Sequence, residues 1–306
     1  MNPNLQIKVG SLTFKNPVLL ASGTSGFGKE ISKFYPLEIL GGFVTKSITL
    51  KPRRGNPPPR IWETPCGLLN SIGLENPGLE KFLEEEMPFL EKINTNIFVS
   101  IAGESVKEYI ELAKNLKDLE ISGIELNISC PNVDKGGIYF GLDRDITYEL
   151  TKSVVKISQK PVWVKLSPET ERIFILINLL KNAGAEAVVV FNTFLGLAID
   201  WRLRKPIFKR IFAGLSGPSI KPLVLRYIWE IYEKISLPIV GCGGIMEFGD
   251  VMEYILAGAS LVEIGTANFI NPNIGKEIVL ELENYFREEK IQDLIGLAHK
   301  RKEDFS

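Results

Sequence analysis

The chain has 306 residues, of which 45% are hydrophobic and 24% charged, and its formal net charge is −1. This length is enough to bury a large core, and the composition is ordinary for a globular protein. The balanced charge provides no basic excess that would attract nucleic acid or an anionic membrane surface. We therefore expect neither as a partner.

Targeting, membrane and metal signals are missing from the sequence. No charged segment followed by an apolar run opens the chain, and no window of about 18 apolar residues follows, so we expect no signal peptide and no membrane span. Three cysteines are too few for a disulfide framework and one short of the four thiolates that usually hold a 2Fe–2S cluster. The single histidine, His299, argues against a histidine base or a histidine metal cluster. These features predict a cytoplasmic protein without a metal site.

The predicted elements begin with a hairpin and continue as alternating strands and helices. Residues 5–9 and 12–14, with a Gly10–Ser11 turn, form the hairpin, which we expect to cap the bottom of a barrel. Continuous apolar runs predict eight strands, at 17–23, 42–48, 97–103, 123–129, 161–167, 187–192, 238–244 and 261–266. Apolar residues at i, i+3 and i+4 predict helices at 80–93, 104–119, 146–159, 170–184, 220–235 and 248–259.

This alternation indicates βαβ units, and eight of them favour a closed (β/α)8 TIM barrel over an open doubly wound sheet. No low-complexity linker interrupts residues 1–306, so we expect a single domain. Three long connections, at 49–75, 131–144 and 193–219, each follow a strand. They should therefore lie on the C-terminal face, where barrel enzymes build their active sites.

Polar residues and glycines gather where the predicted strands end. These positions are Ser22-Gly23, Lys46-Ser47, Ser100, Asn127, Ser129-Cys130, Lys165, Asn192-Thr193, Gly243-Gly244 and Gly265-Thr266. Strand ends are commonly polar, but that tendency does not explain two lysines in a barrel mouth, where each ammonium needs an anion. The set as a whole therefore indicates a binding site.

The glycine pairs that end the last two strands predict a phosphate site. Barrels often bind phosphate with the loops after strands seven and eight, and glycine lets the backbone approach the ligand closely. Gly217, in the preceding long connection, is a candidate for a third backbone donor. A glycine pair is also typical of a simple turn, so the position on these strands is what gives the pattern weight.

The lysines and asparagines are the candidate binding side chains. A lysine near N1 and C2=O of a reduced flavin would stabilise its negative charge, and a second lysine can pair with a substrate carboxylate. A buried structural salt bridge is the alternative for Lys46 and for Lys165. Four asparagines, Asn70, Asn127, Asn132 and Asn192, offer donors and acceptors that match the edge of a pyrimidine-like ring. For any one of them, turn chemistry is the alternative.

Cys130 is the candidate catalytic base. It begins a strand-to-helix loop and is followed by Pro131 and by glycines, which suggests a loop end rather than a core position. A free thiol is only a few per cent thiolate at neutral pH, but a neighbouring lysine lowers its pKa. Cys242 lies inside an apolar strand and is interpreted as a small buried hydrophobe, while Cys66 has no assigned role.

The sequence resembles the class 1 dihydroorotate dehydrogenases along nearly its whole length. The matching stretches are ASGTSGFG (21–28), TKSITLKPRRGNPPPR (45–60), LLNSIGLENPGL (68–79), ELNISCPNV (125–133), VKLSP (164–168), FNT (191–193), GLSGPSIKP (214–222), GCGG (241–244) and IGTANF (264–269). The resemblance implies one flavin mononucleotide (FMN) per chain, lying across the barrel mouth with dihydroorotate stacked on it. It also implies that Cys130 takes the C5 proton while hydride passes from C6 to flavin N5, giving orotate in pyrimidine (UMP) biosynthesis.

The resemblance also implies the residues of the site. The FMN contacts would be Ser22, Gly23, Lys46, Ser47, Asn127, Lys165, Phe191, Gly217, Gly243, Gly244, Gly265 and Thr266. The substrate contacts would be Lys46, Asn70, Ser71, Ile72, Gly73, Leu74, Asn127, Asn132, Asn192 and Thr193. At Ser100 the chain departs from the family, which usually has an asparagine there that reaches FMN. A serine is shorter, so either a water bridges the gap or the contact is lost.

Two stretches, 21–28 and 63–78, are most similar to class 1B, whose members pass electrons to NAD through a second subunit carrying FAD and a 2Fe–2S cluster. Such a partner, and a homodimer of the chain itself, are therefore expected. A class 1A enzyme, a homodimer that reduces fumarate, is the alternative. Class 2 enzymes have a serine base and an N-terminal helical extension, and the sequence shows neither.

Two other functions stay open. A dihydrouridine synthase, also a flavin barrel with a catalytic cysteine, acts on transfer RNA, but it would need a basic surface that the net charge of −1 does not supply. A non-catalytic flavin-binding barrel that serves as a scaffold is the non-enzyme alternative. The combination of Cys130 with four asparagines and two lysines argues against it.

Overall fold

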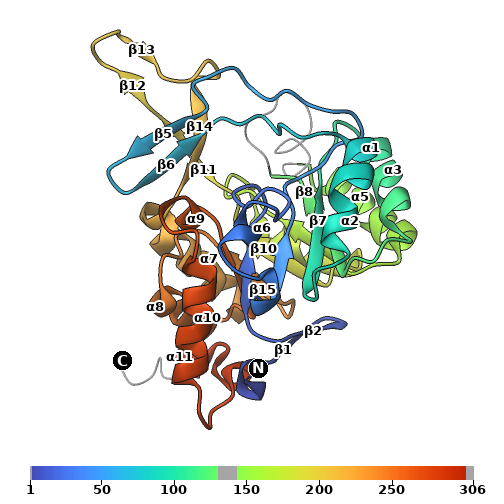
Figure 1. Ribbon diagram of the computed structural model, residues 1–306, viewed down its shortest axis with the longest axis vertical. Helices are drawn as coiled ribbons and strands as arrows, with labels where there is room; N and C mark the ends of the chain where they lie inside the picture. Colours follow the sequence, from blue (N-terminus) through green and yellow to red (C-terminus); the bar gives the residue numbers. More distant parts are fainter. Residues whose placement is uncertain (1, 130–142, 301–306) are drawn as a thin grey trace.

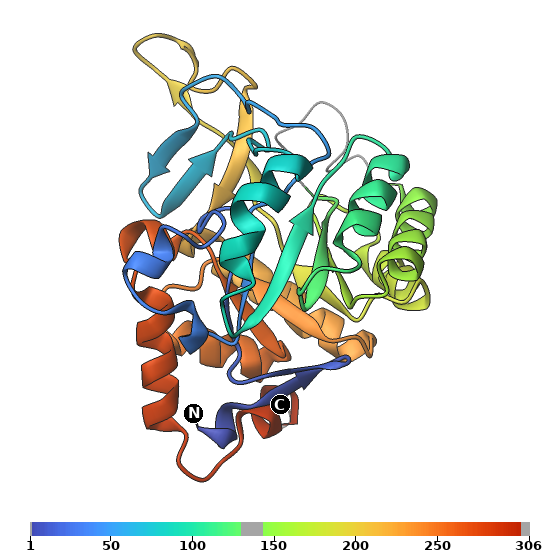
Figure 2. The ribbon, with the colours of Figure 1, turned by 45° about the vertical axis from the view of Figure 1, so that its right-hand side comes forward.

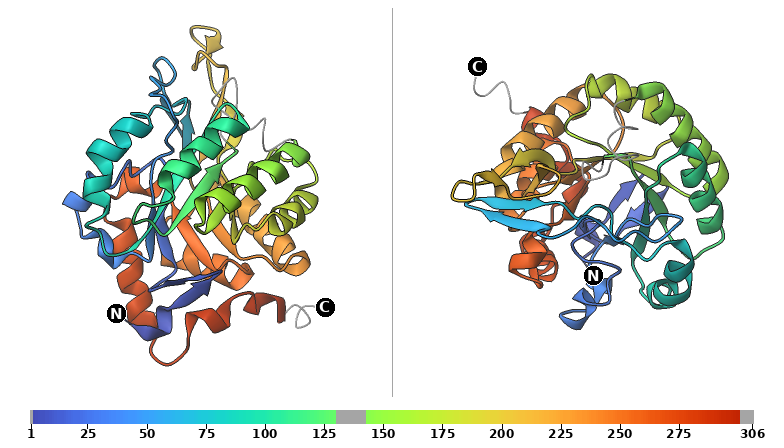
Figure 3. Two further views of the ribbon diagram at one scale, coloured as in Figure 1. Left: turned by 90° about the vertical axis from the view of Figure 1, so that its right-hand side faces the viewer. Right: turned by 90° about the horizontal axis from the view of Figure 1, so that it is seen from above.

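A computed structural model describes residues 2–129 and 143–300. Eight parallel strands close into a barrel in the order β10-β15-β16-β3-β4-β7-β8-β9, and helices surround it, as the view from above shows (Figure 3). The barrel strands are β3 (Val18–Leu20), β4 (Gly42–Val44), β7 (Asn96–Ile101), β8 (Gly123–Asn127), β9 (Val162–Lys165), β10 (Ala187–Val190), β15 (Ile239–Cys242) and β16 (Leu261–Ile264). The predicted TIM barrel is confirmed, and each observed strand overlaps one predicted apolar run.

The barrel strands are short because only a few residues of each run are held between two neighbouring strands. In β8, for example, Ile124 pairs with Val99 of β7 on one side and with Val162 of β9 on the other. All five residues of β8 are buried. Side chains on a strand alternate between its two faces, so every second residue points into the barrel and the others pack against the helices.

The helices follow the strands and cover the outside of the barrel (Figure 1). They are α1 (Leu79–Lys81), the π-helical turn η4 (Phe82–Glu86), α2 (Met87–Leu90), α3 (Val106–Leu116), α5 (Arg144–Ser158), α6 (Ile173–Asn182), α7 (Lys221–Lys234), α8 (Phe248–Ala257), α9 (Ala267–Ile270), α10 (Ile274–Tyr285) and α11 (Leu297–Lys300). Short 3-10 turns are η1 (Pro3–Leu5), η2 (Ile31–Lys33), η3 (Leu37–Ile39), η5 (Pro218–Ile220) and η6 (Ile291–Leu294).

Local sequence signals explain where several helices begin. The side chain of Ser105 accepts a hydrogen bond from the backbone of Glu108 at the start of α3, and Asp143 does the same for two amides of α5. All six predicted helices are present. Helix α10, whose inward face buries Ile278 and Leu282, was not among them. Within the part of the chain that the structure describes, no helix is both long and apolar enough to cross a bilayer.

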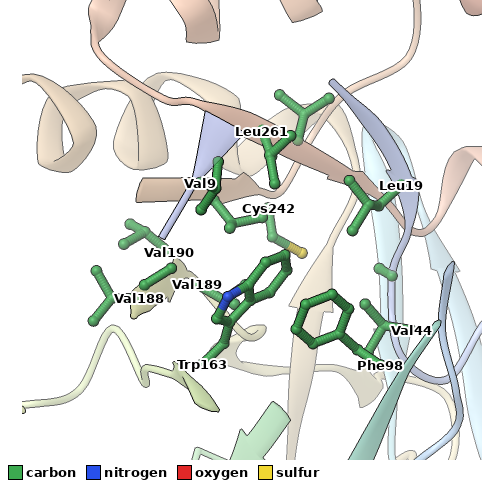
Figure 4. Packing of buried hydrophobic residues seen from close by; sticks show 14 of the residues in the cluster. Val9, Leu19, Val44, Phe98, Trp163, Val188, Val189, Val190, Cys242 and Leu261 are labelled. Carbon is green, nitrogen blue, oxygen red and sulfur yellow. The ribbon is translucent and has the colours of Figure 1, made fainter. Parts of the chain in front are cut away.

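The N-terminal hairpin closes the bottom of the barrel, as predicted. Strands β1 (Ile7–Val9) and β2 (Leu12–Phe14) pair in antiparallel fashion, and the ring centroid of Phe14 lies 5.8 Å from that of Trp163 in β9. Trp163 in turn stacks on Phe98 of β7 at 3.7 Å. Figure 4 shows Trp163 and Phe98 among aliphatic side chains from neighbouring strands. The N-terminal end of the barrel is therefore a packed core and not an opening.

A second sheet lies over the opposite, C-terminal end of the barrel (Figures 1 and 2). It contains four antiparallel strands in the order β11-β14-β6-β5. Its strands are β5 (Ile61–Thr64), β6 (Gly67–Asn70), β11 (Phe194–Leu197) and β14 (Phe212–Ser216), and the short ribbon β12 (Ile199–Asp200) and β13 (Lys205–Pro206) extends from it. The connections 49–75 and 193–219, predicted only as long loops, thus join to form one sheet above the barrel mouth.

Candidate active site

A cavity of about 360 Å³ opens at the C-terminal ends of the barrel strands, beneath the antiparallel sheet. Its volume lies in the range of small-molecule and cofactor sites. Every residue that the resemblance assigned to FMN lines it: Ser22, Gly23, Lys46, Ser47, Asn127, Lys165, Phe191, Gly217, Gly243, Gly244, Gly265 and Thr266. Residues from seven barrel strands and from the antiparallel sheet therefore meet at one place.

Most of the residues predicted to contact the substrate line the same cavity. They are Lys46, Asn70, Ile72, Gly73, Leu74, Asn127, Asn192 and Thr193. Ser71 does not line it. The residue is 2% exposed, and its hydroxyl accepts a hydrogen bond from Asn56 Nδ2 at 3.1 Å. Cys130 and Asn132 lie outside the described residues.

The chain that leads to Cys130 is fixed beside the cavity as far as it is described. Ser129 is fully buried, and its hydroxyl accepts a hydrogen bond from Asn192 Nδ2 at 2.9 Å. The same hydroxyl donates to Asn127 Oδ1 at 3.2 Å. Two asparagines that line the cavity thus hold the residue immediately before Cys130.

The glycines of the site serve two different purposes. Gly244 has a φ of +74°, and a Cβ there would lie 2.7 Å from Cβ of Lys221, so the turn after β15 has no room for a side chain. Gly265 is different, because a Cβ there would meet only Ala21 Cβ at 3.7 Å. At Gly23 a Cβ would meet nothing within 4 Å, although its φ of +106° also favours glycine. The missing side chains at Gly23 and Gly265 leave free space along the cavity wall, which a planar cofactor can occupy.

Lys46 presents a half-buried ammonium to the cavity. Burial is the main reason that its pKa is lowered, Glu75 partly offsets that effect, and Arg60 adds to it. Among the described residues, no carboxylate lies within ion-pair distance of its Nζ. A cation that is partly desolvated and has no ion-pair partner favours an anionic ligand. The sequence allowed two interpretations of Lys46, a ligand-binding role and a structural salt bridge. The structure favours the ligand-binding role.

A line of hydroxyl groups extends from the cavity into the barrel. Ser22 Oγ lies 3.4 Å from Ser47 Oγ, and Ser47 Oγ lies 2.8 Å from Ser100 Oγ. Asn127 Nδ2 donates to the same Ser47 hydroxyl at 2.9 Å. Ser100 is fully buried and is not part of the cavity wall. Its contact with the site therefore passes through Ser47.

Lys165 lies at the cavity floor, where its ammonium meets two buried carboxylates. Nζ is 2.6 Å from Glu263 Oε2 and 3.6 Å from Glu125 Oε2. Burial alone would lower the lysine pKa, but Cys242, Glu125 and Glu263 outweigh it, and the pKa stands well above its ordinary value. Both interpretations made from the sequence therefore apply to Lys165, because it lines the cavity and also belongs to a buried salt bridge.

Comparison with known proteins identifies the family. A family model described as dihydroorotate dehydrogenase matches residues 4–286. The chain belongs to the dihydroorotate dehydrogenase family. The sequence-based prediction of an oxidoreductase of this family is therefore confirmed.

Curated relatives of this dihydroorotate dehydrogenase family member align over their full length. A protein of Desulforamulus reducens is 48% identical over 303 residues, covering 98% of this chain and 100% of its own. A protein of Thermoanaerobacter pseudethanolicus is 45% identical over 301 residues, covering 98% and 100% respectively. Both are named "Dihydroorotate dehydrogenase B (NAD(+)), catalytic subunit". These names support the predicted similarity to class 1B.

A solved structure has the same fold. The crystal structure of a dihydroorotate dehydrogenase from Eimeria tenella in complex with ferulenol superposes with a TM-score of 0.80. The alignment covers 98% of this chain and 89% of the other at 23% identity. At that identity the similarity supports the shared barrel and no finer conclusion.

Sequence reasoning missed three residues at the floor of the site. Cys242 was interpreted as a core residue; it is buried, as expected, but it also lines the cavity. Burial raises the pKa of its thiol to about 12. Glu125 and Glu263 were not among the predicted site residues. The two-residue period of a strand would have found them, because each precedes a predicted site residue, Asn127 or Gly265, by two positions.

Proposed function

We propose that this protein is an FMN-dependent dihydroorotate dehydrogenase that oxidises dihydroorotate to orotate in pyrimidine (UMP) biosynthesis. The observation that carries the proposal is the single cavity that brings together two lysines, three asparagines and the glycine-lined strand ends. Family membership supplies the reaction, and the cavity supplies groups that suit both a flavin and a pyrimidine ring. Residues 1–306 would act as one FMN-binding domain.

The chain's own residues suit FMN in three respects. Gly243, Gly244 and Gly265 end β15 and β16, where barrels commonly bind phosphate. Gly23 and Gly265 leave space for a flat ring system along the wall. Lys165 supplies a cation at the floor, suited to the negative charge of a reduced flavin. When bound, FMN would supply the hydride acceptor for the reaction.

The substrate side of the cavity is lined by amides and by the second lysine. Asn70, Asn127 and Asn192 offer donors and acceptors to the alternating N–H and C=O groups of the dihydroorotate ring. Lys46 would pair with its carboxylate, because this ammonium is half-buried and without an ion-pair partner among the described residues. Asn132 completes this set in the proposal, although it lies outside the described residues.

Cys130 would act as the base that takes the C5 proton. Its own position is outside the described residues, but the hydrogen bonds of Ser129 to Asn127 and Asn192 fix the preceding residue at the cavity. A base placed there would lie on the substrate side of the site. With the proton removed from C5 and hydride removed from C6, the ring gains the C5–C6 double bond of orotate.

The decisive experiment is anaerobic reduction of the purified protein. We expect a yellow protein with one FMN per chain, whose flavin absorbance is bleached by dihydroorotate. The alternative flavin barrel, a dihydrouridine synthase, would instead react with uridine-containing RNA. If uridine-containing RNA bleached the flavin and dihydroorotate did not, the protein would instead be assigned to the dihydrouridine synthases. A flavin-free protein that binds neither ligand would refute both.

The electron acceptor forms a further part of the proposal. Two curated relatives are named NAD-linked catalytic subunits, which supports transfer to NAD through a partner subunit that carries FAD and a 2Fe–2S cluster. Co-purification from the native host tests this: an iron–sulfur flavoprotein in stoichiometric amount is expected. If the chain purifies alone and its flavin is reoxidised by fumarate and not by NAD, the class 1A alternative replaces the proposed transfer to NAD. A cytoplasmic location stays a prediction.

A further inference from the structure

Three ionisable side chains meet inside the barrel, directly beneath the active-site cavity. Glu125, Lys165 and Glu263 come from β8, β9 and β16, and both glutamates have 0% exposure. The single ammonium lies 2.6 Å from one carboxylate and 3.6 Å from the other. The net charge of this cluster therefore depends on whether the two acids hold a proton.

The oxygen atoms of the two acids indicate that a proton is present. In the described part of the chain, both Oε atoms of Glu125 and Oε1 of Glu263 are buried without a hydrogen-bond partner. An ionised carboxylate can only accept, whereas a protonated carboxyl also donates. Two ionised acids would leave a net negative charge and three unsatisfied acceptors in the barrel, which is costly. One proton between them supplies the missing donor.

The other groups around the cluster do not change its charge. Cys242 of β15 faces Glu263, and burial raises the pKa of its thiol to about 12, so it is neutral near pH 7. The Ser100 hydroxyl of β7 favours the ionised form of Glu125 without making a hydrogen bond to it, and it is itself uncharged. Burial, set against Lys165, raises the pKa of Glu125 to about 8. Lys165 and the two acids thus determine the charge.

We propose that Glu125 and Glu263 share one proton, so that the cluster with Lys165 is neutral overall, and that this balance sets the reduction potential of the bound flavin. The second part rests on the proposed function, because it requires FMN above Lys165. An uncompensated lysine would favour the anionic reduced flavin and raise the potential. One carboxylate offsets that effect and keeps the potential low, which suits delivery of electrons to NAD, a weak oxidant. Glu125 and Glu263 are thus positioning residues that act through Lys165.

The test compares Glu125→Gln, Glu263→Gln and the double variant, with the exposed Glu281→Gln on α10 as the matched control. In either single variant one acid remains, and it ionises opposite Lys165, so the net charge stays zero. We expect the ratio of FMN affinities in the reduced and oxidised states to change less than tenfold, which is about 30 mV in the two-electron midpoint potential. In the double variant Lys165 is unopposed, and we expect that ratio to rise more than tenfold.

Two outcomes of the potential measurement would overturn the proposal. If each single variant raises the potential and the two shifts add in the double variant, both acids are ionised in the native protein. If the double variant has the potential of the wild type and of Glu281→Gln, the flavin does not respond to the cluster. The shared proton predicts a different pattern, in which neither single variant changes the flavin potential appreciably and the double variant raises it.

A second measurement needs no flavin and no double variant. Infrared spectroscopy of the wild type at pH 7 should show the C=O band of a protonated, buried carboxyl, which both single variants lose and Glu281→Gln keeps. Absence of the band in the wild type would overturn the shared proton even if the protein oxidises dihydroorotate. A protein with the band but without flavin would instead refute the proposed function.

Discussion

At the residue scale, Glu125 shows how the barrel interior changes ordinary acid chemistry. Its carboxyl is completely buried in β8, and burial raises its pKa to about 8. An unfolded glutamate has a pKa of about 4.3, so between these two values the folded protein holds a proton that the unfolded chain releases. The stabilising effect is complete below the lower value and is lost as the pH rises through the higher one.

We therefore predict that stability falls with rising pH in this window and that Glu125→Gln removes part of the slope. One such group contributes at most about 1.4 kcal/mol per pH unit. Urea unfolding at pH 5, 6 and 7 measures the free energy of unfolding of both proteins. The free energy of unfolding of the wild type should fall steadily relative to that of the variant as the pH rises. Parallel curves would show that Glu125 is ionised in the folded state.

Cys130 gives the second prediction at this scale. Cys130→Ala should still bind orotate, because the groups assigned to substrate binding are elsewhere. Reduction of FMN by dihydroorotate should slow by about 10²–10⁴-fold, the usual contribution of a positioned base. Stopped-flow absorbance under anaerobic conditions measures the rate, and Cys66→Ala, an exposed cysteine with no assigned role, is the control. Near-normal reduction by Cys130→Ala would mean that another group takes the proton.

At the scale of elements, the turns after β15 and β16 contain glycines with different roles. We expect Gly244 to matter for folding and Gly265 to matter for ligand binding. Gly244→Ala should destabilise the protein by about 1–3 kcal/mol, because its φ is +74° and the new Cβ would lie 2.7 Å from Lys221. Gly265→Ala should fold normally, since its nearest neighbour would be 3.7 Å away, but the added methyl enters the cavity. Thermal unfolding and FMN titration of both variants test the pair. If Gly265→Ala and the wild type bind FMN with equal affinity, the cavity wall at Gly265 is not part of the flavin site.

The elements that were predictable from sequence are those with a strong local pattern. The eight barrel strands are continuous apolar runs, and the barrel places their ends together, so Lys46, Asn127 and Gly243 meet as expected. The sheet above the mouth was not predictable, because β6 and β14 pair residues such as Asn70 and Gly214 that no local signal connects. The cluster under the cavity is a different case. The strand period places Glu125 and Glu263 on the same side as Asn127 and Gly265, but only closure of the barrel brings both acids to Lys165.

At the scale of the whole molecule, the antiparallel sheet and its ribbon expose an apolar surface. Its exposed side chains are Ile61, Trp62, Leu195, Leu197, Ile199, Trp201, Leu203, Ile211 and Phe212. Exposed apolar side chains gathered on one sheet and its ribbon are typical of an interaction site. We infer that this surface, residues 61–62 and 195–212, is where the expected homodimer forms.

The dimer prediction is tested by Trp201→Ser combined with Phe212→Ser, which removes two side chains that are 75% and 55% exposed. Because neither packs in the core, the variant should remain folded but shift toward monomer by sedimentation velocity. Ile175→Ser, an exposed apolar position on α6, is the control and should stay dimeric. A wild type that is monomeric at every concentration, or a double variant that is still dimeric, would contradict the assignment.

The long separation between the two halves of that sheet also determines the order of events during synthesis. Strand β6 acquires its β14 neighbour only after about 140 further residues have been made, and Asn70 Nδ2 then donates to Gly214 O at 3.1 Å. Long-range pairing of this kind forms late, since the intervening loop must close first. The β15 and β16 strand ends emerge later still. A nascent chain therefore passes through most of its translation with an incomplete cavity, and the proposed FMN would be captured only as the last quarter of the barrel is added.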